Sequence, residues 1–197
     1  MSICFPTRVY GGYIFDLDGT LVDSMPLHFA AWKEGLRRSG FAGEFSEELF
    51  YSLGGVPTLR IVEIINEKFG TRLVPEAVMH VKEEIYVEML PRVRRIEPVV
   101  AFAEERVALG RPVAIASGGP RPVVDLSLRG AGIAHLFPVV ITPEDVSAGK
   151  PSPEMFLLAA KRLGVRPEDC LVLEDAEMGR RAAVAAGMDY VMVPMVR

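Results

Sequence analysis

The stretch Gly12-Tyr13-Ile14-Phe15-Asp16-Leu17-Asp18-Gly19-Thr20 decides the fold of this chain. Its first four residues are apolar, with aromatic and β-branched side chains, so they predict a strand that is buried on both faces. Two aspartates and a glycine follow directly, which places charged groups at the carboxyl end of that strand. Later runs of the same kind predict further strands at residues 112–116, 139–141, 170–173 and 190–193.

Helical patterns separate the later runs. Apolar residues recur at helical spacing near residues 120–131, 153–164 and 177–187, and Gly164 and Gly187 stand where these helices are expected to end. Strands that alternate with helices at this spacing form a parallel sheet covered on both faces. We therefore predict an α/β fold with a doubly wound parallel sheet.

The long interval between the first and second strand-like runs has a different character. It contains three helical patterns, at 25–38, 58–69 and 75–90, and no strand-like run. We predict that residues 23–92 form a helical insertion, and that residues 1–22 and 93–197 form the sheet domain.

Composition excludes several classes of protein. The 197 residues include 26 acidic and 22 basic side chains, and the net charge of −4 gives no general reason to bind nucleic acid or anionic lipid. No apolar stretch approaches the roughly 18 residues of a membrane span, and residues 1–8 lack the pattern of a signal peptide. The two cysteines, Cys4 and Cys170, form neither a disulfide framework nor a zinc motif. We expect a soluble cytoplasmic protein, and the oligomeric state stays open, a monomer included.

Acidic side chains gather at the predicted strand ends. Asp16 and Asp18 are two positions apart, so in extended chain they project to the same side. Glu174 and Asp175 end another strand, and the carboxyl ends of parallel strands share one edge of the sheet. Carboxylates this close require a cation or a shared proton. Their hard oxygen atoms suit Mg²⁺.

Two further segments provide groups for an anion. Ser117 follows a strand, and the backbone N–H groups of Gly118 and Gly119 can cradle a phosphate at the start of a helix. Lys150, in Gly-Lys-Pro, adds a compact positive charge. Carboxylates, a metal and an anion cradle together indicate phosphoryl transfer, with one aspartate as the nucleophile.

Each of these segments also has a purely structural interpretation. A lone Asp-x-Asp is usually an exposed turn, Ser-Gly-Gly an ordinary loop, Gly-Lys-Pro a surface turn, and Glu-Asp the cap of the next helix. These interpretations weaken jointly, because all four segments fall at strand ends of one predicted sheet.

The same residues resemble the haloacid dehalogenase superfamily. Residues 15–24, FDLDGTLVDS, match its first motif, DxDGTLxDS. Ser117 matches the second motif and Lys150 the third, and residues 173–176 with Gly179 match the fourth. The resemblance covers essentially the whole chain, and it implies a Rossmann-like core with a helical cap inserted after the first motif.

The resemblance also implies a role for each site residue. Asp16 corresponds to the nucleophile and Asp18 to the general acid and base, while Ser117 and Lys150 correspond to phosphate contacts. The Mg²⁺ ligands correspond to Asp16, Asp18 through its backbone carbonyl, and Asp175, with Glu174 nearby or bridging through water. An aspartate at the position of Asp18 is typical of the phosphatases and mutases of the superfamily.

Within the superfamily, residues 26–28 and 31–33 resemble the β-phosphoglucomutase-like branch. Residues 54–58 and 165–179 are most similar to its sugar-phosphate phosphatases, such as those that act on fructose 1-phosphate and 6-phosphogluconate. We therefore expect a Mg²⁺-dependent phosphatase of a small phosphorylated metabolite, with a sugar phosphate as substrate.

The sequence leaves two alternatives to a phosphatase. A phosphosugar mutase has an arginine where this chain has Thr58, and Ser-Lys where it has Gly119-Pro120, although Arg60 or Arg121 could compensate. A non-catalytic regulator would be expected to have lost a catalytic residue, and none is missing.

The insertion is expected to act as a lid. Two linkers would join residues 23–92 to the sheet domain, and a lid over strand ends excludes bulk water from a reactive intermediate. His28, Lys33 and Arg60 are its candidate contacts to a sugar.

Overall fold

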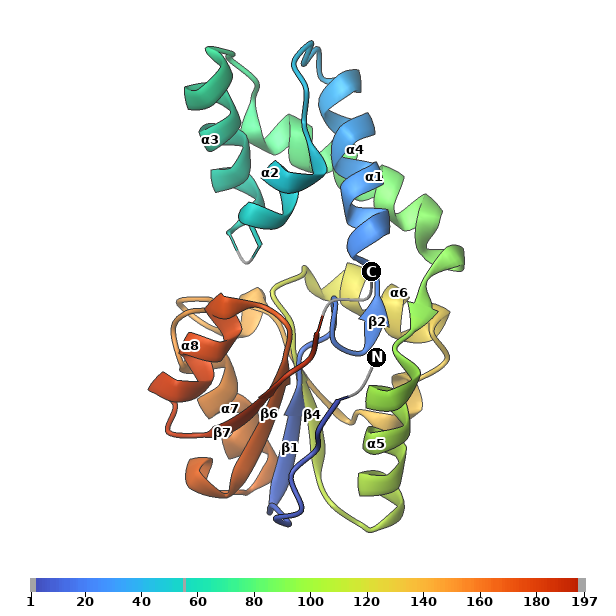
Figure 1. Cartoon of the computed structure of the whole chain (residues 1–197), viewed down its shortest axis with the longest axis vertical. Helices are drawn as coiled ribbons and strands as arrows, with labels where there is room; N and C mark the ends of the chain where they lie inside the picture. The colour runs from blue at the N-terminus through green and yellow to red at the C-terminus, as the bar shows by residue number, and fades with distance from the viewer. Residues whose placement is uncertain (1–2, 55, 195–197) are drawn as a thin grey trace. The chain divides into compact units, whose positions relative to one another are not determined.

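The computed structural model describes residues 3–54 and 56–194. It contains a parallel sheet of five strands in the order β5-β4-β1-β6-β7 (Figure 1). The strands are β1 (Gly12–Phe15), β4 (Val113–Ala116), β5 (Val139–Ile141), β6 (Cys170–Glu174) and β7 (Asp189–Met192). Every pairing within this sheet is parallel. The predicted doubly wound α/β fold is confirmed.

The alternation of side chains along β1 explains why both faces of the sheet are covered. Tyr13 and Phe15 pack into one apolar cluster, whereas Ile14 packs into another. Successive side chains of a strand point to opposite faces, so an apolar strand needs a partner layer on each side.

Four helices supply these two layers. Helices α5 (Glu97–Ala108) and α6 (Arg121–Gly130) contribute Phe102 and Val124 to the cluster of Tyr13 and Phe15. On the other face, α7 (Glu154–Leu163) and α8 (Glu177–Ala185) contribute to the cluster of Ile14. Short 3-10 turns complete this unit: η2 (Ala134–Leu136), η3 (Pro143–Asp145) and η4 (Pro167–Asp169).

Helix ends follow the glycines that the sequence marks. Gly164 is the C-cap of α7 with a φ of 69°, and Gly187 follows the end of α8 with a φ of 72°. This left-handed conformation is the one that glycine adopts without a steric cost. Helix α5 was not predicted, because its apolar residues lie close together in the sequence and give no clear helical period; the buried ones are Val99, Val100, Phe102 and Ala103.

The chain divides into two compact units, Met1–Asp23 with Val93–Arg197, and Ser24–Arg92. The second unit consists of α1 (Met25–Arg38), α2 (Glu47–Ser52), α3 (Thr58–Phe69) and α4 (Pro75–Met89), with the turn η1 (Leu90–Arg92) at its end. Its core includes Trp32, Leu36 and Ile65. A short antiparallel ribbon of β2 (Val22–Asp23) and β3 (Arg94–Arg95) lies at the two boundaries between the units in the sequence.

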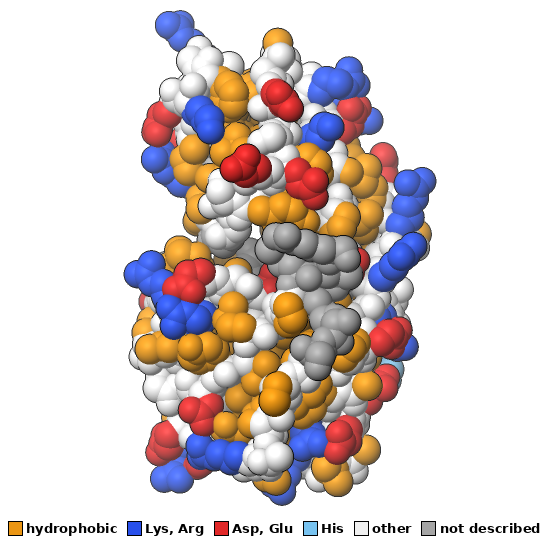
Figure 2. Space-filling model, in the orientation of Figure 1, with side chains coloured by type: hydrophobic (Ala, Val, Ile, Leu, Met, Phe, Trp, Pro, Cys, Tyr) orange, Lys and Arg blue, Asp and Glu red, His pale blue; other side chains and the backbone are white. Residues whose placement is uncertain are grey.

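The face of the molecule drawn in Figure 2 shows no strong segregation of charge. On the face drawn in Figure 2, basic and acidic side chains are interspersed with apolar ones rather than gathered into one patch. Among the helices of the described residues, none is long and apolar enough to cross a membrane.

The central strand should be the most sensitive part of the sheet to loss of volume. Ile14 is fully buried, so Ile14→Ala removes apolar contacts and leaves a cavity, and it should lower the free energy of unfolding by about 2–5 kcal/mol. Val9 is 59% exposed, and Val9→Ala should change stability by no more than about 0.5 kcal/mol. Urea denaturation followed by circular dichroism compares the two. Equal losses would contradict this account of the core.

Candidate active site

The register of the sheet brings the predicted site residues to one edge. Phe15 pairs with Leu173 of β6 and with Ile115 of β4. Asp16 extends the first pairing, since its backbone N–H donates to the Leu173 carbonyl over 2.9 Å. Ser117 stands two positions beyond Ile115, so it leaves its strand at the same edge.

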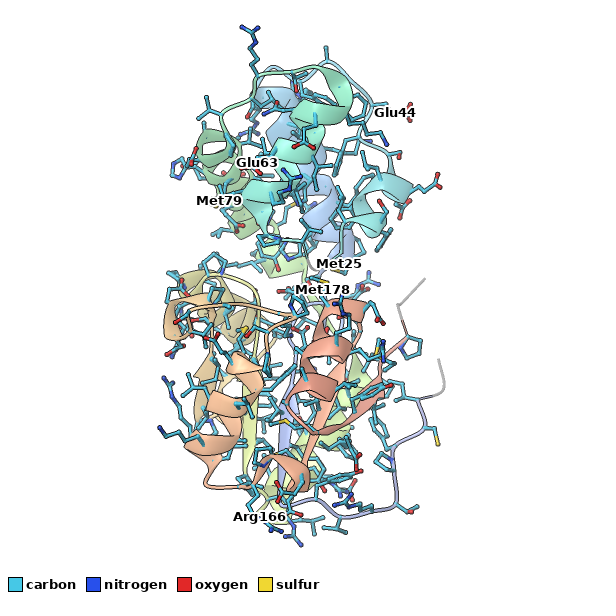
Figure 3. All side chains as sticks on the ribbon, turned by 90° about the vertical axis from the view of Figure 1, so that its left-hand side faces the viewer. Met25, Glu44, Glu63, Met79, Arg166 and Met178 are labelled. Carbon is cyan, nitrogen blue, oxygen red and sulfur yellow. The ribbon has the colours of Figure 1, made fainter. Side chains whose placement is uncertain are left out.

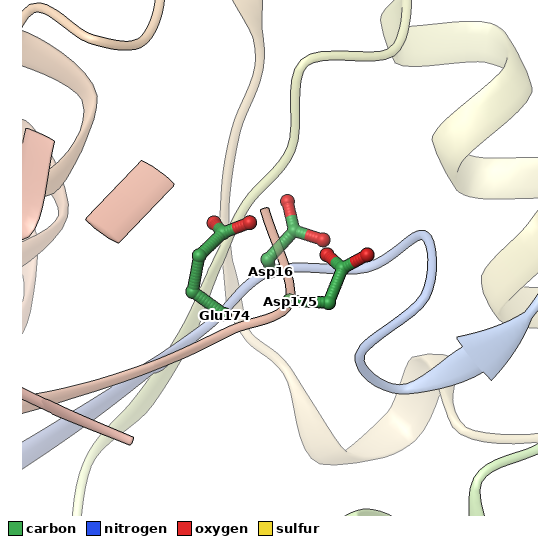
Figure 4. Close-up of side chains that lie close together, drawn as sticks. All are labelled: Asp16, Glu174 and Asp175. Atoms are coloured by element: carbon green, nitrogen blue, oxygen red, sulfur yellow. The ribbon is translucent and has the colours of Figure 1, made fainter. Parts of the chain in front are cut away.

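Three carboxylates converge at this edge. Asp16, Glu174 and Asp175 each offer an oxygen atom, and these atoms all lie within 4.8 Å of one another (Figure 4). Asp16 is only 6% exposed and Glu174 only 1%. The structure therefore brings together the side chains of three predicted metal ligands. Asp18, which was predicted to offer its backbone carbonyl, has its carboxylate outside this group. Its Oδ2 lies instead 3.9 Å from the position that a Cβ on Gly119 would occupy, beside the Ser-Gly-Gly loop.

Lys150 is the positive charge at the centre of the site. Its Nζ lies 2.6 Å from Asp16 Oδ1 and 2.6 Å from Glu174 Oε2, and its side chain is 10% exposed. Burial alone would lower the pKa of this ammonium, but the charges of Asp16 and Glu174 outweigh burial and raise its pKa. Lys150 therefore stays protonated and holds the ends of β1 and β6 together.

One ammonium does not neutralise three carboxylates. Burial, and next to it the charge of Glu174, raises the pKa of Asp16 well above its ordinary value. The same two causes raise the pKa of Asp175 to about 7. These groups carry an unfavourable excess of negative charge, which protons or a cation can relieve. A buried set of oxygen donors with this charge fits a hard divalent cation.

The carboxylate of Glu174 serves two structural partners at once. Its Oε2 accepts the bond from Lys150, and its Oε1 accepts the backbone N–H of Ala176 at 3.0 Å, just before α8. A Cβ on Gly179 would overlap this carboxylate, so only glycine lets the helix pass so close. Glu174 thus bonds the N-cap residue of α8, Ala176, but it accepts no N–H from the first turn of the helix, so the helix-capping interpretation is not borne out.

Glycine is also required in the turn after Asp18. Gly19 has a φ of 84°, and a Cβ there would overlap Asp175 Oδ2. Thr20 donates a hydrogen bond from its Oγ1 to Asp175 Oδ1 at 3.4 Å. It was not among the predicted site residues. It is fully buried and orients Asp175, and its place directly after the motif glycine was the signal that could have identified it.

The Ser-Gly-Gly loop was predicted to cradle an anion with the N–H groups of Gly118 and Gly119, and the structure engages that of Gly119 within the loop. Ser117 is buried, and its Oγ accepts the N–H of Gly119 at 3.1 Å, which leaves the hydroxyl proton to donate. Gly118 is exposed at the surface of the loop. The N–H of Arg121, the first residue of α6, donates to Glu144 Oε1 at 3.1 Å. The start of α6 is therefore occupied by a carboxylate of the protein itself.

The candidate sugar contacts of the helical unit already have partners within that unit. Arg60 bonds Glu63 and Glu67 on its own helix, both at 2.9 Å; Glu63 is labelled in Figure 3. The ammonium of Lys33 lies 5.5 Å from the centre of the Phe29 ring, and His28 stacks on Tyr86. The stretch 54–58 contains Gly55, which lies outside the described residues.

A parallel α/β sheet with a charged site at its carboxyl edge defines an enzyme of the Rossmann-like class. The sequence model of the haloacid dehalogenase-like hydrolases matches residues 10–187, and the chain belongs to this family. It is therefore a hydrolase, as the sequence motifs predict.

Relatives of known name cover nearly the same span. Fructose-1-phosphate phosphatase YqaB of Escherichia coli (strain K12) is 37% identical over 95% of this chain and 98% of its own. Beta-phosphoglucomutase of Bacillus subtilis (strain 168) is 30% identical over 89% of this chain and 79% of its own. The crystal structure of CbbY from Rhodobacter sphaeroides in complex with phosphate covers 95% of this chain and 88% of its own, with a TM-score of 0.85 and 24% identity. That last likeness shows the shared fold.

The raised pKa of Asp175 makes stability depend on pH. The unfolded chain loses this proton near the ordinary value of 3.8, whereas the folded protein keeps it up to about 7. Between these values the folded state binds more protons, so the free energy of unfolding falls as the pH rises. We expect the protein in EDTA to be less stable at pH 8 than at pH 5, and Asp175→Asn to reduce this difference.

Urea denaturation at the two pH values measures the effect. Asp125→Asn, on the outer face of α6, is the matched control and should keep the wild-type pH dependence. If Asp175→Asn also keeps it in full, Asp175 does not hold its proton in the folded protein.

Proposed function

We propose that this protein is a Mg²⁺-dependent phosphatase that hydrolyses a small phosphorylated metabolite, with a sugar phosphate as its substrate. The observation that carries the proposal is the buried carboxylate of Asp16, which is bonded to Lys150 and lies among Glu174 and Asp175 at the edge of the sheet. Because a phosphate monoester is anionic, its approach to Asp16 requires positive charge, which Lys150 and a bound cation would supply.

The reaction would proceed in two displacements at phosphorus. Asp16 attacks the phosphorus atom, the bond to the ester oxygen breaks, and Asp18 gives its proton to the leaving oxygen. Asp18 then takes a proton from water as this water attacks the aspartyl-phosphate. The second displacement releases inorganic phosphate and restores the carboxylate of Asp16.

The other site residues bind the phosphate group in this scheme. Ser117 would donate its hydroxyl proton, Gly118 its backbone N–H, and Lys150 its ammonium to phosphate oxygens. Lys150 also favours the ionised form of Asp16, which is the form that can attack. These contacts hold the phosphorus in line with the nucleophile.

Asp16, Asp175, Glu174 and the backbone carbonyl of Asp18 would hold Mg²⁺. When bound, this cation would offset the excess negative charge of the carboxylates and draw electron density from the phosphate oxygens. In this proposal residues 1–22 and 93–197 carry the chemistry and residues 23–92 are a helical cap. A relative named for its action on fructose 1-phosphate supports the choice of a sugar phosphate.

A phosphosugar mutase is the second candidate, since a relative carries the name beta-phosphoglucomutase. A mutase must grip two phosphate groups. Both arginines that could replace the missing contacts are engaged elsewhere: Arg60 bonds two glutamates, and Arg121 bonds Asp125 and the Val140 carbonyl. These bonds favour the phosphatase. Incubation with β-glucose 1-phosphate and a bisphosphate primer separates the two, because isomer formation faster than phosphate release would identify a mutase.

Loss of the nucleophile should abolish turnover without unfolding the protein. Asp16→Asn removes the attacking carboxylate and should lower kcat for p-nitrophenyl phosphate and for a sugar phosphate by at least about 1,000-fold. The asparagine also reduces the charge excess, so thermal stability should not fall by a comparable degree. Phosphate release with Mg²⁺ is the measurement, and Asp125→Asn should keep wild-type activity. Turnover retained in Asp16→Asn excludes Asp16 as the nucleophile.

Mg²⁺ should stabilise the protein more at high pH than at low pH. Protons compete with the cation for Asp175, whose pKa is raised to about 7, so binding is weaker at pH 5 than at pH 8. Thermal unfolding with Mg²⁺ or with EDTA should give a larger increase in Tm at pH 8, and Asp175→Asn should lose most of that increase. An equal increase at both pH values, or one that Asp175→Asn keeps, would show that Mg²⁺ binds elsewhere.

A further inference from the structure

The segment between β5 and α7 carries Lys150, and a single carboxylate holds this segment. Glu154, the first residue of α7, accepts the backbone N–H of Ser147 at 2.9 Å and of Ala148 at 3.2 Å, both on Oε2. Its Oε1 accepts the hydroxyl of Ser152 at 3.3 Å. Residues before and after Lys150 are thus bonded to the same side chain.

Burial cannot hold this segment in its place. Ser147, Ala148 and Gly149 are exposed, and a Cβ on Gly149 would meet open space. Beyond them the chain reverses, with the Ser152 N–H bonded to the Gly149 carbonyl at 3.0 Å. Hydrogen bonds to Glu154 therefore restrain Ser147 and Ala148, and these bonds are charge-assisted.

The neighbouring carboxylates are engaged in other contacts. Glu144, Asp145 and Glu154 line an open hollow of about 430 Å³. Glu144 accepts the N–H of Arg121, while Asp145 accepts from Thr142 and Arg162. All three carboxylates that line the hollow are therefore already bonded to other groups of the protein. Of the three, Glu154 is the one that bonds the segment directly before Lys150.

We propose that Glu154 is a positioning residue for Lys150: by bonding the chain on both sides of this lysine, it holds the ammonium where it meets Asp16 and Glu174. The kinetic part of this proposal rests on the proposed phosphatase function. The structural part does not, because the bonds from Lys150 to Asp16 and Glu174 belong to the protein itself.

Removal of the Glu154 carboxylate should lower the rate of phosphate release rather than unfold the protein. A displacement of about 1 Å in a catalytic group can cost on the order of 100-fold in rate. We expect Glu154→Ala to lower kcat for p-nitrophenyl phosphate about 10- to 100-fold. Glu154→Gln keeps an oxygen that can accept the same N–H groups, so it should recover a large part of this loss. Glu76→Ala, which removes an exposed carboxylate from the first turn of α4, is the matched control and should leave kcat unchanged.

A double-mutant cycle separates positioning from a general structural role. If Glu154 acts through Lys150, then Glu154→Ala should change kcat by less than about twofold once Lys150→Ala is already present. If the two losses multiply instead, Glu154 acts independently of Lys150, and the proposal is overturned.

Two measurements that need no turnover test the same point. In Glu154→Ala, hydrogen exchange should increase at Ser147 and Ala148, and acetic anhydride should acetylate Lys150 at least several-fold faster than in the wild type, as measured by mass spectrometry. In Glu154→Gln and Glu76→Ala both rates should stay near the wild-type rates. Unchanged exchange and acetylation in Glu154→Ala would overturn the positioning role.

The two proposals can fail separately. A wild-type protein that releases no phosphate from any monoester would refute the phosphatase, while the exchange and acetylation rates would still decide the role of Glu154. An active wild type with unchanged acetylation in Glu154→Ala would refute only the positioning role.

Discussion

The ion pairs of Lys150 are the interaction on which the rest of this structure depends. The buried ammonium of Lys150 bridges Asp16 at the end of β1 and Glu174 at the end of β6. Its Nζ lies 2.6 Å from a carboxylate oxygen of each. Without Lys150, both buried carboxylates would lose their positive partner, and an uncompensated buried charge is costly. The bridge therefore does more than join two strands, because it offsets the cost of burying the carboxylate of Asp16.

The remaining charge excess connects stability with chemistry. Asp16 and Asp175 have raised pKa values because burial and Glu174 both oppose their ionisation. Under the proposed function, a bound cation would relieve this excess of negative charge and favour the approach of an anionic substrate. Perturbed pKa values of this kind are common at functional sites. The small residues around the site, Gly19 and Gly179, allow the carboxylates to approach without steric overlap.

Parallel topology explains why residues so distant in sequence meet. Each parallel strand returns through a helix, so the segments that follow β1, β4 and β6 all leave the sheet at the same edge. The apolar strands fix that edge from both faces, and the exposed segment that carries Lys150 is held by the hydrogen bonds of Glu154. Under the proposed function, the strands and this segment together would define where a phosphate group binds. The relatives of this chain include proteins named as phosphatases and one named as a mutase.

The sequence by itself determined the α/β class, the doubly wound sheet and the family, because strand periodicity and the four motifs are local patterns of residue type. It also predicted a set of site residues, of which the structure brings four into contact at one edge of the sheet: Asp16, Lys150, Glu174 and Asp175. The roles of these four, and of Asp18, Ser117 and Gly118, stay predictions. The sequence missed Thr20, Glu154 and helix α5, and it left open whether Arg60 was available to a substrate. Only the tertiary structure decided these points, since hydrogen bonds, ion pairs and burial depend on which side chains meet in space. A motif records which residue types stand at given spacings, whereas the partner that holds a side chain in place depends on the path of the whole backbone.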